Sequence, residues 1–171
     1  MNNTNFKITR KKDYFGIIDE VKNIHILTKT YTFGKNIVWD RNIKICNSKS
    51  EPMDNLIIGD NVYLGHDSTI MVSSFSVMDY TKINNHFYAY GNNPLEIGYN
   101  CWFGSSVILD TLGGLKIDNN VGIGNQTQIY SHAKFGDTLY GCRINSFTPI
   151  SIAEDVWIAP NSTITSASMS P

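Results

Sequence analysis

The chain has 171 residues, which is enough for one domain with a sizeable hydrophobic core. Its formal net charge is −1, charged residues make up only 17% of it, and they form no long basic stripe, so nucleic acid is not an expected partner. No stretch approaches the roughly eighteen consecutive apolar residues of a membrane-spanning helix, and no transmembrane segment is predicted.

The first predicted element, residues 1–32, is an N-terminal capping segment. Asp13 is a suitable N-cap for a short helix whose apolar positions fall at helical spacing. These positions are Tyr14, Ile17, Ile18, Val21 and Ile24. Because an open stack of strands exposes unpaired edges, we expect this segment, irregular or partly helical, to cover the end of the domain that follows.

The second predicted element, residues 33–171, is built on a six-residue repeat. Weak units begin with Phe33, Trp39 and Ile45, and clear units run from Ile58 to Ile164. Short regular periods are typical of solenoids, in which each unit buries its apolar residue by stacking on its neighbours. Coils of three units are predicted to start at Ile58, Val77, Ile97, Ile117 and Ile152.

Strand geometry explains the unit. Side chains alternate across a strand, so the aliphatic residue and the small residue two positions before it both point inward. Three short strands then close into a triangular coil of about eighteen residues, and coils stack about 4.8 Å apart through parallel hydrogen bonds. Cys101 occupies an inward position, where we expect a small filler. Residues 133–151 break the period and are predicted to form a loop insertion.

The cysteines and the start of the chain indicate a compartment. Cys46, Cys101 and Cys142 are too few and too far apart for a metal knuckle or a disulfide framework. Residues 1–20 are polar and lack the apolar stretch of a signal peptide. Free thiols without an export signal predict a cytoplasmic protein.

One segment of the repeat domain narrows the function. Ile129-Tyr130-Ser131-His132 ends a coil, and after the insertion the next coil contains Val156-Trp157-Ile158. With the repeat itself, this arrangement resembles the hexapeptide-repeat acyltransferases, and within them the sugar and capsule O-acetyltransferases. The resemblance implies a left-handed parallel β-helix, although general crossover rules would favour the right hand. It also implies acetyl-CoA as co-substrate, a saccharide hydroxyl as acceptor, and a homotrimer.

In that family a histidine at the end of a repeat is the general base, and the resemblance gives this role to His132. An imidazole is mostly neutral yet basic at cytoplasmic pH, so it can take the proton of the acceptor hydroxyl. Asp110 is the best partner, because both residues are expected to face outward on the same side of successive coils. Two simpler interpretations stay open: His132 as a surface histidine at a loop entrance, and Asp110 as an ordinary occupant of a repeat position.

Two tryptophans share one position of the repeat. Trp102 and Trp157 are sixth in their units, and Gly122 holds the same position in the coil between them, so the rings are expected to flank a gap on one outer edge. In the family, neighbouring subunits of a trimer form the active site along such edges, with the acyl donor in the cleft. This implies Trp157 and Ala159 as acetyl-CoA contacts; simple subunit packing is the alternative for Trp157.

The remaining candidate residues concern the acceptor and metals. Candidate substrate contacts are Tyr130, Arg143, Asn145, His86 and Trp102. His86 is also an alternative base. A γ-class carbonic anhydrase would need three zinc histidines, and the wide separation of the histidines here argues against one, so no metal is predicted.

Two other functions remain open. An N-acetyltransferase acting on an amino-sugar nucleotide would use the same base. After Ile164 the chain runs into a small polar tail, where relatives carry further coils that line the donor site. We therefore expect C-terminal coils to be missing, which leaves a truncated, catalytically silent scaffold as the second alternative.

Overall fold

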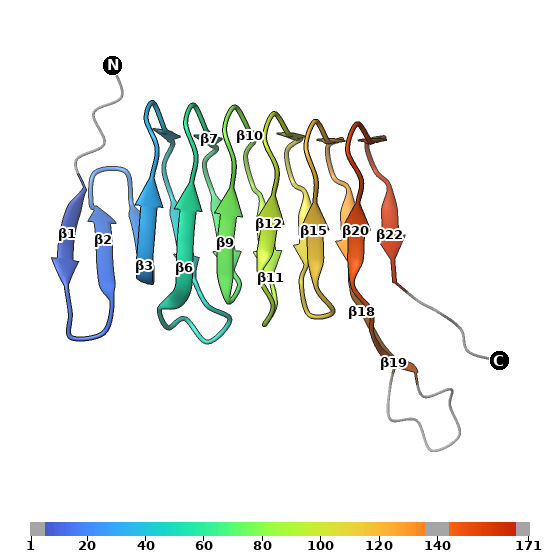
Figure 1. The fold of residues 1–171 in the computed structure, drawn as a ribbon, viewed down its shortest axis with the longest axis horizontal. Helices are drawn as coiled ribbons and strands as arrows, with labels where there is room; N and C mark the ends of the chain where they lie inside the picture. The colour runs from blue at the N-terminus through green and yellow to red at the C-terminus, as the bar shows by residue number, and fades with distance from the viewer. Residues whose placement is uncertain (1–5, 136–143, 167–171) are drawn as a thin grey trace.

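The structure is a computed structural model that describes residues 6–135 and 144–166, with the backbone alone at 134–135 and 144–146. All regular secondary structure in these residues is β-strand, as the repeat predicted. Figure 1 shows the strands standing side by side along the long axis of the molecule. The described residues contain no helix that could span a membrane.

The strands wind in coils of three, and each coil contributes one strand to each of three faces. The first face contains β3 (Ile24–Phe33), β6 (Met53–Ile58), β9 (Ser74–Val77), β12 (Leu95–Ile97), β15 (Leu115–Ile117) and β20 (Ile150–Ile152). The second contains β4 (Val38–Trp39), β7 (Tyr63–Leu64), β10 (Lys82–Ile83), β13 (Trp102–Phe103), β16 (Gly122–Ile123) and β21 (Trp157–Ile158). The third contains β5 (Ile43–Cys46), β8 (Ser68–Met71), β11 (Tyr88–Tyr90), β14 (Ile108–Asp110), β17 (Gln128–Tyr130) and β22 (Thr163–Thr165). Neighbours within a face pair in parallel, which makes the domain a parallel β-solenoid.

The interior of the solenoid is filled by the positions that the repeat predicted. The aliphatic or aromatic residue of each clear unit is at most 1% exposed from Ile58 to Ile129. The residue two positions earlier is buried as well, and Cys101, 2% exposed, is the small filler expected there. These inward residues form one continuous hydrophobic core through the stack.

The turns at the corners between strands explain why the residues that follow the glycine of each unit are polar. The fourth residue of a unit adopts a left-handed backbone conformation, as at Asn61 (φ 57°) and Asn100 (φ 53°). Asparagine tolerates this conformation better than most residues. Corner asparagines of neighbouring coils also form hydrogen bonds with each other, as where the Asn100 amide donates to Asn120 Oδ1 over 2.9 Å. From Ile58 to Ile117 the coils advance by 19 or 20 positions rather than about eighteen, because the turn from the third face to the first, such as 111–114, holds extra residues.

Glycine follows the inward aliphatic residue because the next coil comes close there. Asn125 Oδ1 accepts a hydrogen bond from Ser105 N over 2.8 Å, directly above Gly104. A Cβ built at Gly104 would lie 2.5 Å from the backbone nitrogen of Asn125, a separation that real structures do not show. The glycine of one coil therefore interlocks with the third residue of the corresponding unit in the next coil, as Gly98 does with Asn119.

The N-terminal cap differs from the prediction, because it contains strands in place of a helix. β1 (Lys7–Arg10) pairs antiparallel with β2 (Phe15–Asp19), and β2 pairs antiparallel with β3. The turn that contains Asp13 is closed by Lys11 N donating to Tyr14 O over 2.8 Å. Alternation along β2 buries Ile17 fully, whereas Val21 is 91% exposed and faces no core. The free edge of β3 offers backbone partners to a strand, and this pairing outweighs the helical spacing.

The insertion also contains strands rather than a plain loop. β18 (His132–Phe135) and β19 (Ile144–Phe147) pair antiparallel and belong to no face of the solenoid. In Figure 1 they extend away from the stack near β20. The chain leaves the third face after β17, runs through this pair, and rejoins the first face at β20.

Candidate active site

The structure brings Asp110 and His132 into direct contact. Asp110 ends β14, and His132 lies just beyond β17, its neighbour on the third face. The Nδ1 atom of His132 forms a short hydrogen bond with Asp110 Oδ2. The prediction that the two side chains meet is therefore confirmed at the level of geometry.

Asp110 is held from several sides. Its side chain is fully buried, although it points away from the core, and Oδ1 accepts the Leu112 N–H over 2.6 Å. Ser131 Oγ donates to the Asp110 carbonyl over 2.7 Å and accepts the Gly113 N–H over 2.8 Å. A buried carboxylate needs hydrogen-bond partners, and here Leu112 N–H binds Oδ1 while Oδ2 faces the imidazole.

The imidazole of His132 is covered but accessible. Its side chain is 22% exposed, and the Phe147 ring stacks on it with centroids 5.8 Å apart and planes inclined by 18°. An ionised carboxylate only accepts hydrogen bonds, so Nδ1 carries the hydrogen in this pair. The other ring nitrogen, Nε2, is then the basic one, which is the arrangement of a positioned general base.

Two tyrosines flank the carboxylate along the third face. Tyr90 and Tyr130 are its register partners on β11 and β17. Burial, and then the negative charge of Asp110, raise the pKa of Tyr90 to about 12. The Tyr130 hydroxyl donates to Gln128 Oε1 over 2.7 Å. Tyr90 and Tyr130 therefore lie on either side of Asp110 along the third face.

The tryptophans lie on the second face, away from the third-face strand that ends in Asp110. Their rings stack with centroids 5.9 Å apart and planes inclined by 29°. A Cβ at Gly122 would lie 2.6 Å from Trp157 Cζ3, because the indole covers that glycine. The prediction of a gap between the two rings is therefore wrong, because the Trp157 ring covers Gly122 and stacks on Trp102. Trp102 is 37% and Trp157 61% exposed, so the pair is an aromatic surface within this subunit.

The other candidate residues are scattered or lie outside what is described. Ala159 is exposed after β21, and its carbonyl accepts from Thr127 Oγ1 over 3.1 Å. His86 lies at a corner before β11, far along the repeat from His132. Arg143 lies outside the described residues. For Asn145, in β19, only the backbone is described, and it pairs with Lys134 in β18.

Several contributors to the site were not predicted. Phe147 follows an aperiodic segment, and nothing in the repeat indicates that its ring returns to His132. Ser131 precedes the candidate base in the sequence, but the repeat does not predict that its hydroxyl binds the Asp110 carbonyl and the Gly113 N–H. Tyr90 was detectable in principle, because it holds the same position as Asp110 and Tyr130 in the preceding coil.

Chemically, the arrangement can accept and return one proton at Nε2 of His132. The Asp110 carboxylate fixes the tautomer and stabilises the imidazolium that forms. Comparisons of the chain with family models, with curated proteins and with solved structures give no match. The inference of function therefore depends on the repeat and on this geometry.

Proposed function

We propose that the protein is an acetyl-CoA-dependent O-acetyltransferase that acts on a saccharide hydroxyl. The observation that carries the proposal is the contact between the buried Asp110 carboxylate and Nδ1 of His132, at the point where the chain leaves the repeat. Burying a carboxylate is costly, so a buried Asp110 that is hydrogen-bonded to a partly exposed histidine favours a functional pair over a chance surface contact.

The proposed reaction moves one proton out and back. Nε2 of His132 takes the proton of the acceptor hydroxyl while the hydroxyl oxygen attacks the thioester carbonyl of acetyl-CoA. The tetrahedral intermediate collapses with cleavage of the C–S bond, and the imidazolium returns its proton to the departing CoA thiolate. Asp110 acts as a positioning residue, since it contacts the imidazole and not the substrate.

The wider proposal includes the winding and the assembly. We take the solenoid to be left-handed and the protein to be a cytoplasmic homotrimer, in which the tryptophan face of one subunit lies against the His132 edge of its neighbour. The exposed, stacked rings of Trp102 and Trp157 support this, because aromatic residues are enriched in interface cores. Trp157 and Ala159 would then contact the acyl donor across the subunit boundary. The described cysteines, Cys46 and Cys101, are free thiols, in keeping with a reducing compartment.

The test begins with acetyl-CoA. Binding is measured by calorimetry, and acetyl transfer by release of CoA thiol in the presence of a panel of saccharides. We expect His132→Ala to bind acetyl-CoA and to lose about 10²- to 10⁴-fold in turnover, the usual contribution of a general base. Asp110→Asn is expected to lose turnover as well, with a smaller effect on KM than on kcat, since it acts through His132.

The matched control is His25→Ala, which removes an exposed histidine whose Nε2 forms a hydrogen bond with the Asn23 side chain. It should keep full activity. Equal turnover in His132→Ala and the unaltered protein would remove His132 as base. Failure of the unaltered protein to bind acetyl-CoA would reject the transferase and leave a scaffold. Transfer to amino-sugar nucleotides alone would replace O- by N-acetylation.

A further inference from the structure

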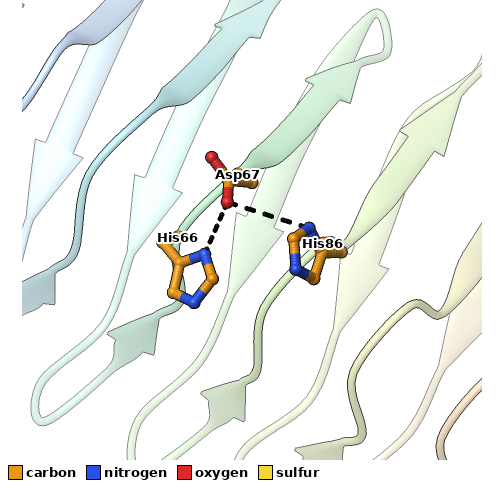
Figure 2. A group of neighbouring side chains, drawn as sticks. All are labelled: His66, Asp67 and His86. Atoms are coloured by element: carbon orange, nitrogen blue, oxygen red, sulfur yellow. Dashed lines mark hydrogen bonds and ion pairs between the residues drawn. The ribbon is translucent and has the colours of Figure 1, made fainter.

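A second cluster of functional side chains lies on a different corner of the solenoid. His66, Asp67 and His86 meet between the second and third faces, at the turns that precede β8 and β11. One ligand atom from each of the three lies within 4.8 Å of the other two. Figure 2 shows both imidazole rings directed at the Asp67 carboxylate.

The distances within the cluster lie on either side of the spacing that ligands of one ion have. His66 Nδ1 is 2.7 Å and His86 Nδ1 is 3.8 Å from Asp67 Oδ2. The two imidazole rings are 5.1 Å apart between centroids and nearly perpendicular, at 85°. Nitrogen and oxygen ligands about 2.0–2.2 Å from a tetrahedral ion are separated by roughly 3.3–3.6 Å. Small rotations of these partly exposed side chains would bring all three to that spacing.

The backbone beneath the cluster is fixed by the stacking of the coils. His86 N donates to the His66 carbonyl over 2.9 Å, and His66 N donates to Asn85 Oδ1 over 3.2 Å. The wide separation that argued against a γ-class carbonic anhydrase concerns sequence positions, and His66 and His86 are 20 residues apart in the sequence. They lie one coil apart, so the repeat places them side by side.

The carboxylate has its own support. The Asn42 amide donates to Asp67 Oδ1 over 2.7 Å, which leaves Oδ2 directed at the two rings. The Asn42 hydrogen bond, and then the one from His66, hold the pKa of Asp67 below its ordinary value. A carboxylate oriented by a neighbour in the shell behind it is typical of metal ligands.

We propose that His66, Asp67 and His86 form a binding site for one divalent transition-metal ion of the Zn²⁺ class. Two imidazoles and a carboxylate suit zinc, nickel or copper better than calcium or magnesium, which prefer oxygen ligands alone. Three protein ligands on an exposed corner leave at least one coordination position for water or an external ligand.

This site is separate from the Asp110–His132 pair. The cluster precedes the third-face strands β8 and β11, whereas Asp110 ends β14 and His132 lies beyond the end of β17. Metal binding therefore does not depend on the proposed transferase activity, and each can fail without the other.

The experiment titrates Zn²⁺ into the full chain, without a histidine tag, and follows binding by calorimetry. Co²⁺ is added in parallel as a spectroscopic probe, and Ca²⁺ as an oxygen-preferring competitor. We expect one Zn²⁺ per chain, visible Co²⁺ absorption that Zn²⁺ abolishes, and no displacement by Ca²⁺. Asp67→Asn and His86→Asn should weaken Zn²⁺ binding by more than the about 10- to 100-fold typical of a lost outer partner.

The substitutions are chosen so that the fold survives. Asp67 and His86 both have left-handed backbones (φ 55° and 58°), which asparagine accepts. Asn42→Gly keeps its own corner conformation and removes the amide that orients Asp67, together with the hydrogen bond from Asn23, so it should cost about 10- to 100-fold in affinity. His25→Asn is the matched control and should bind Zn²⁺ as the unaltered chain does.

Three results would overturn the proposal. The first is that the unaltered chain does not bind Zn²⁺. The second is unchanged affinity in both Asp67→Asn and His86→Asn. The third is loss of the ion in His132→Asn with retention in His86→Asn, which would place it at the other histidine–carboxylate pair.

Discussion

A methyl group added at Gly104 should force two stacked corners of the solenoid apart and destabilise the fold. The Cβ of Gly104→Ala would lie 2.5 Å from Asn125 N and 2.7 Å from Asn125 Cα, both of which are backbone atoms that cannot rotate away. The coils must separate locally, and the hydrogen bond from Ser105 N to Asn125 Oδ1, 2.8 Å long, is lost or stretched with them.

The expected magnitude has two parts. Overpacking of a close contact costs about 1–3 kcal/mol, and a lost hydrogen bond adds about 1 kcal/mol, so the free energy of unfolding should fall by about 2–4 kcal/mol. For a chain of this size each kcal/mol lowers Tm by about 2–4 °C, which gives a decrease of about 4–16 °C. Thermal unfolding followed by far-ultraviolet circular dichroism measures it.

Gly16→Ala is the matched control, because it adds the same methyl group to a strand where space exists. A Cβ at Gly16 would have no neighbour closer than 4.0 Å. Gly16 is buried, but the added methyl group would make only ordinary contacts, so Gly16→Ala should keep the stability or raise it by up to about 1 kcal/mol. If Gly104→Ala unfolds at the same temperature as the unaltered chain, or if both variants are equally damaging, the glycine interlock is refuted.

Three further predictions follow from the same structure. Tyr90 should titrate with a pKa of about 12, so its contribution to stability is complete below the ordinary tyrosine pKa of about 10 and is lost as the pH rises through 12. In Asp110→Asn an NMR titration should find this pKa lower but still raised, because burial is the larger cause; an unchanged value would contradict the role of the charge. Leu109→Ala, at a fully buried position, should cost about 2–5 kcal/mol in denaturant unfolding, and a loss below 1 kcal/mol would mean that the core is not packed as described. At the left-handed corner, Asn100→Ala should cost about 1–2 kcal/mol whereas Asn100→Gly should cost less, and the reverse order in thermal unfolding would exclude the conformational explanation.

The repeat predicts most of the fold, because its six-residue period indicates which side chains face inward. Ile97, Phe103 and Leu109 follow one another at six-residue intervals, and all three are buried as expected. The same period placed Asp110 and His132 on neighbouring strand ends of one face, where they do touch. Such inferences succeed since stacked coils share one backbone geometry and differ only in side chains.

Tertiary structure decided whatever the period does not govern. The cap became strands because β3 offered an unpaired edge, which no local pattern in residues 6–19 reveals. Phe147 contacts His132 because β18 and β19, which lie outside the repeat, pair antiparallel. Trp157 lies over Gly122 because the missing side chain leaves room for an indole. His66 and His86 converge on Asp67 by their side-chain rotamers. A sequence period specifies where backbones stack, but only packing in three dimensions decides how side chains from different coils meet.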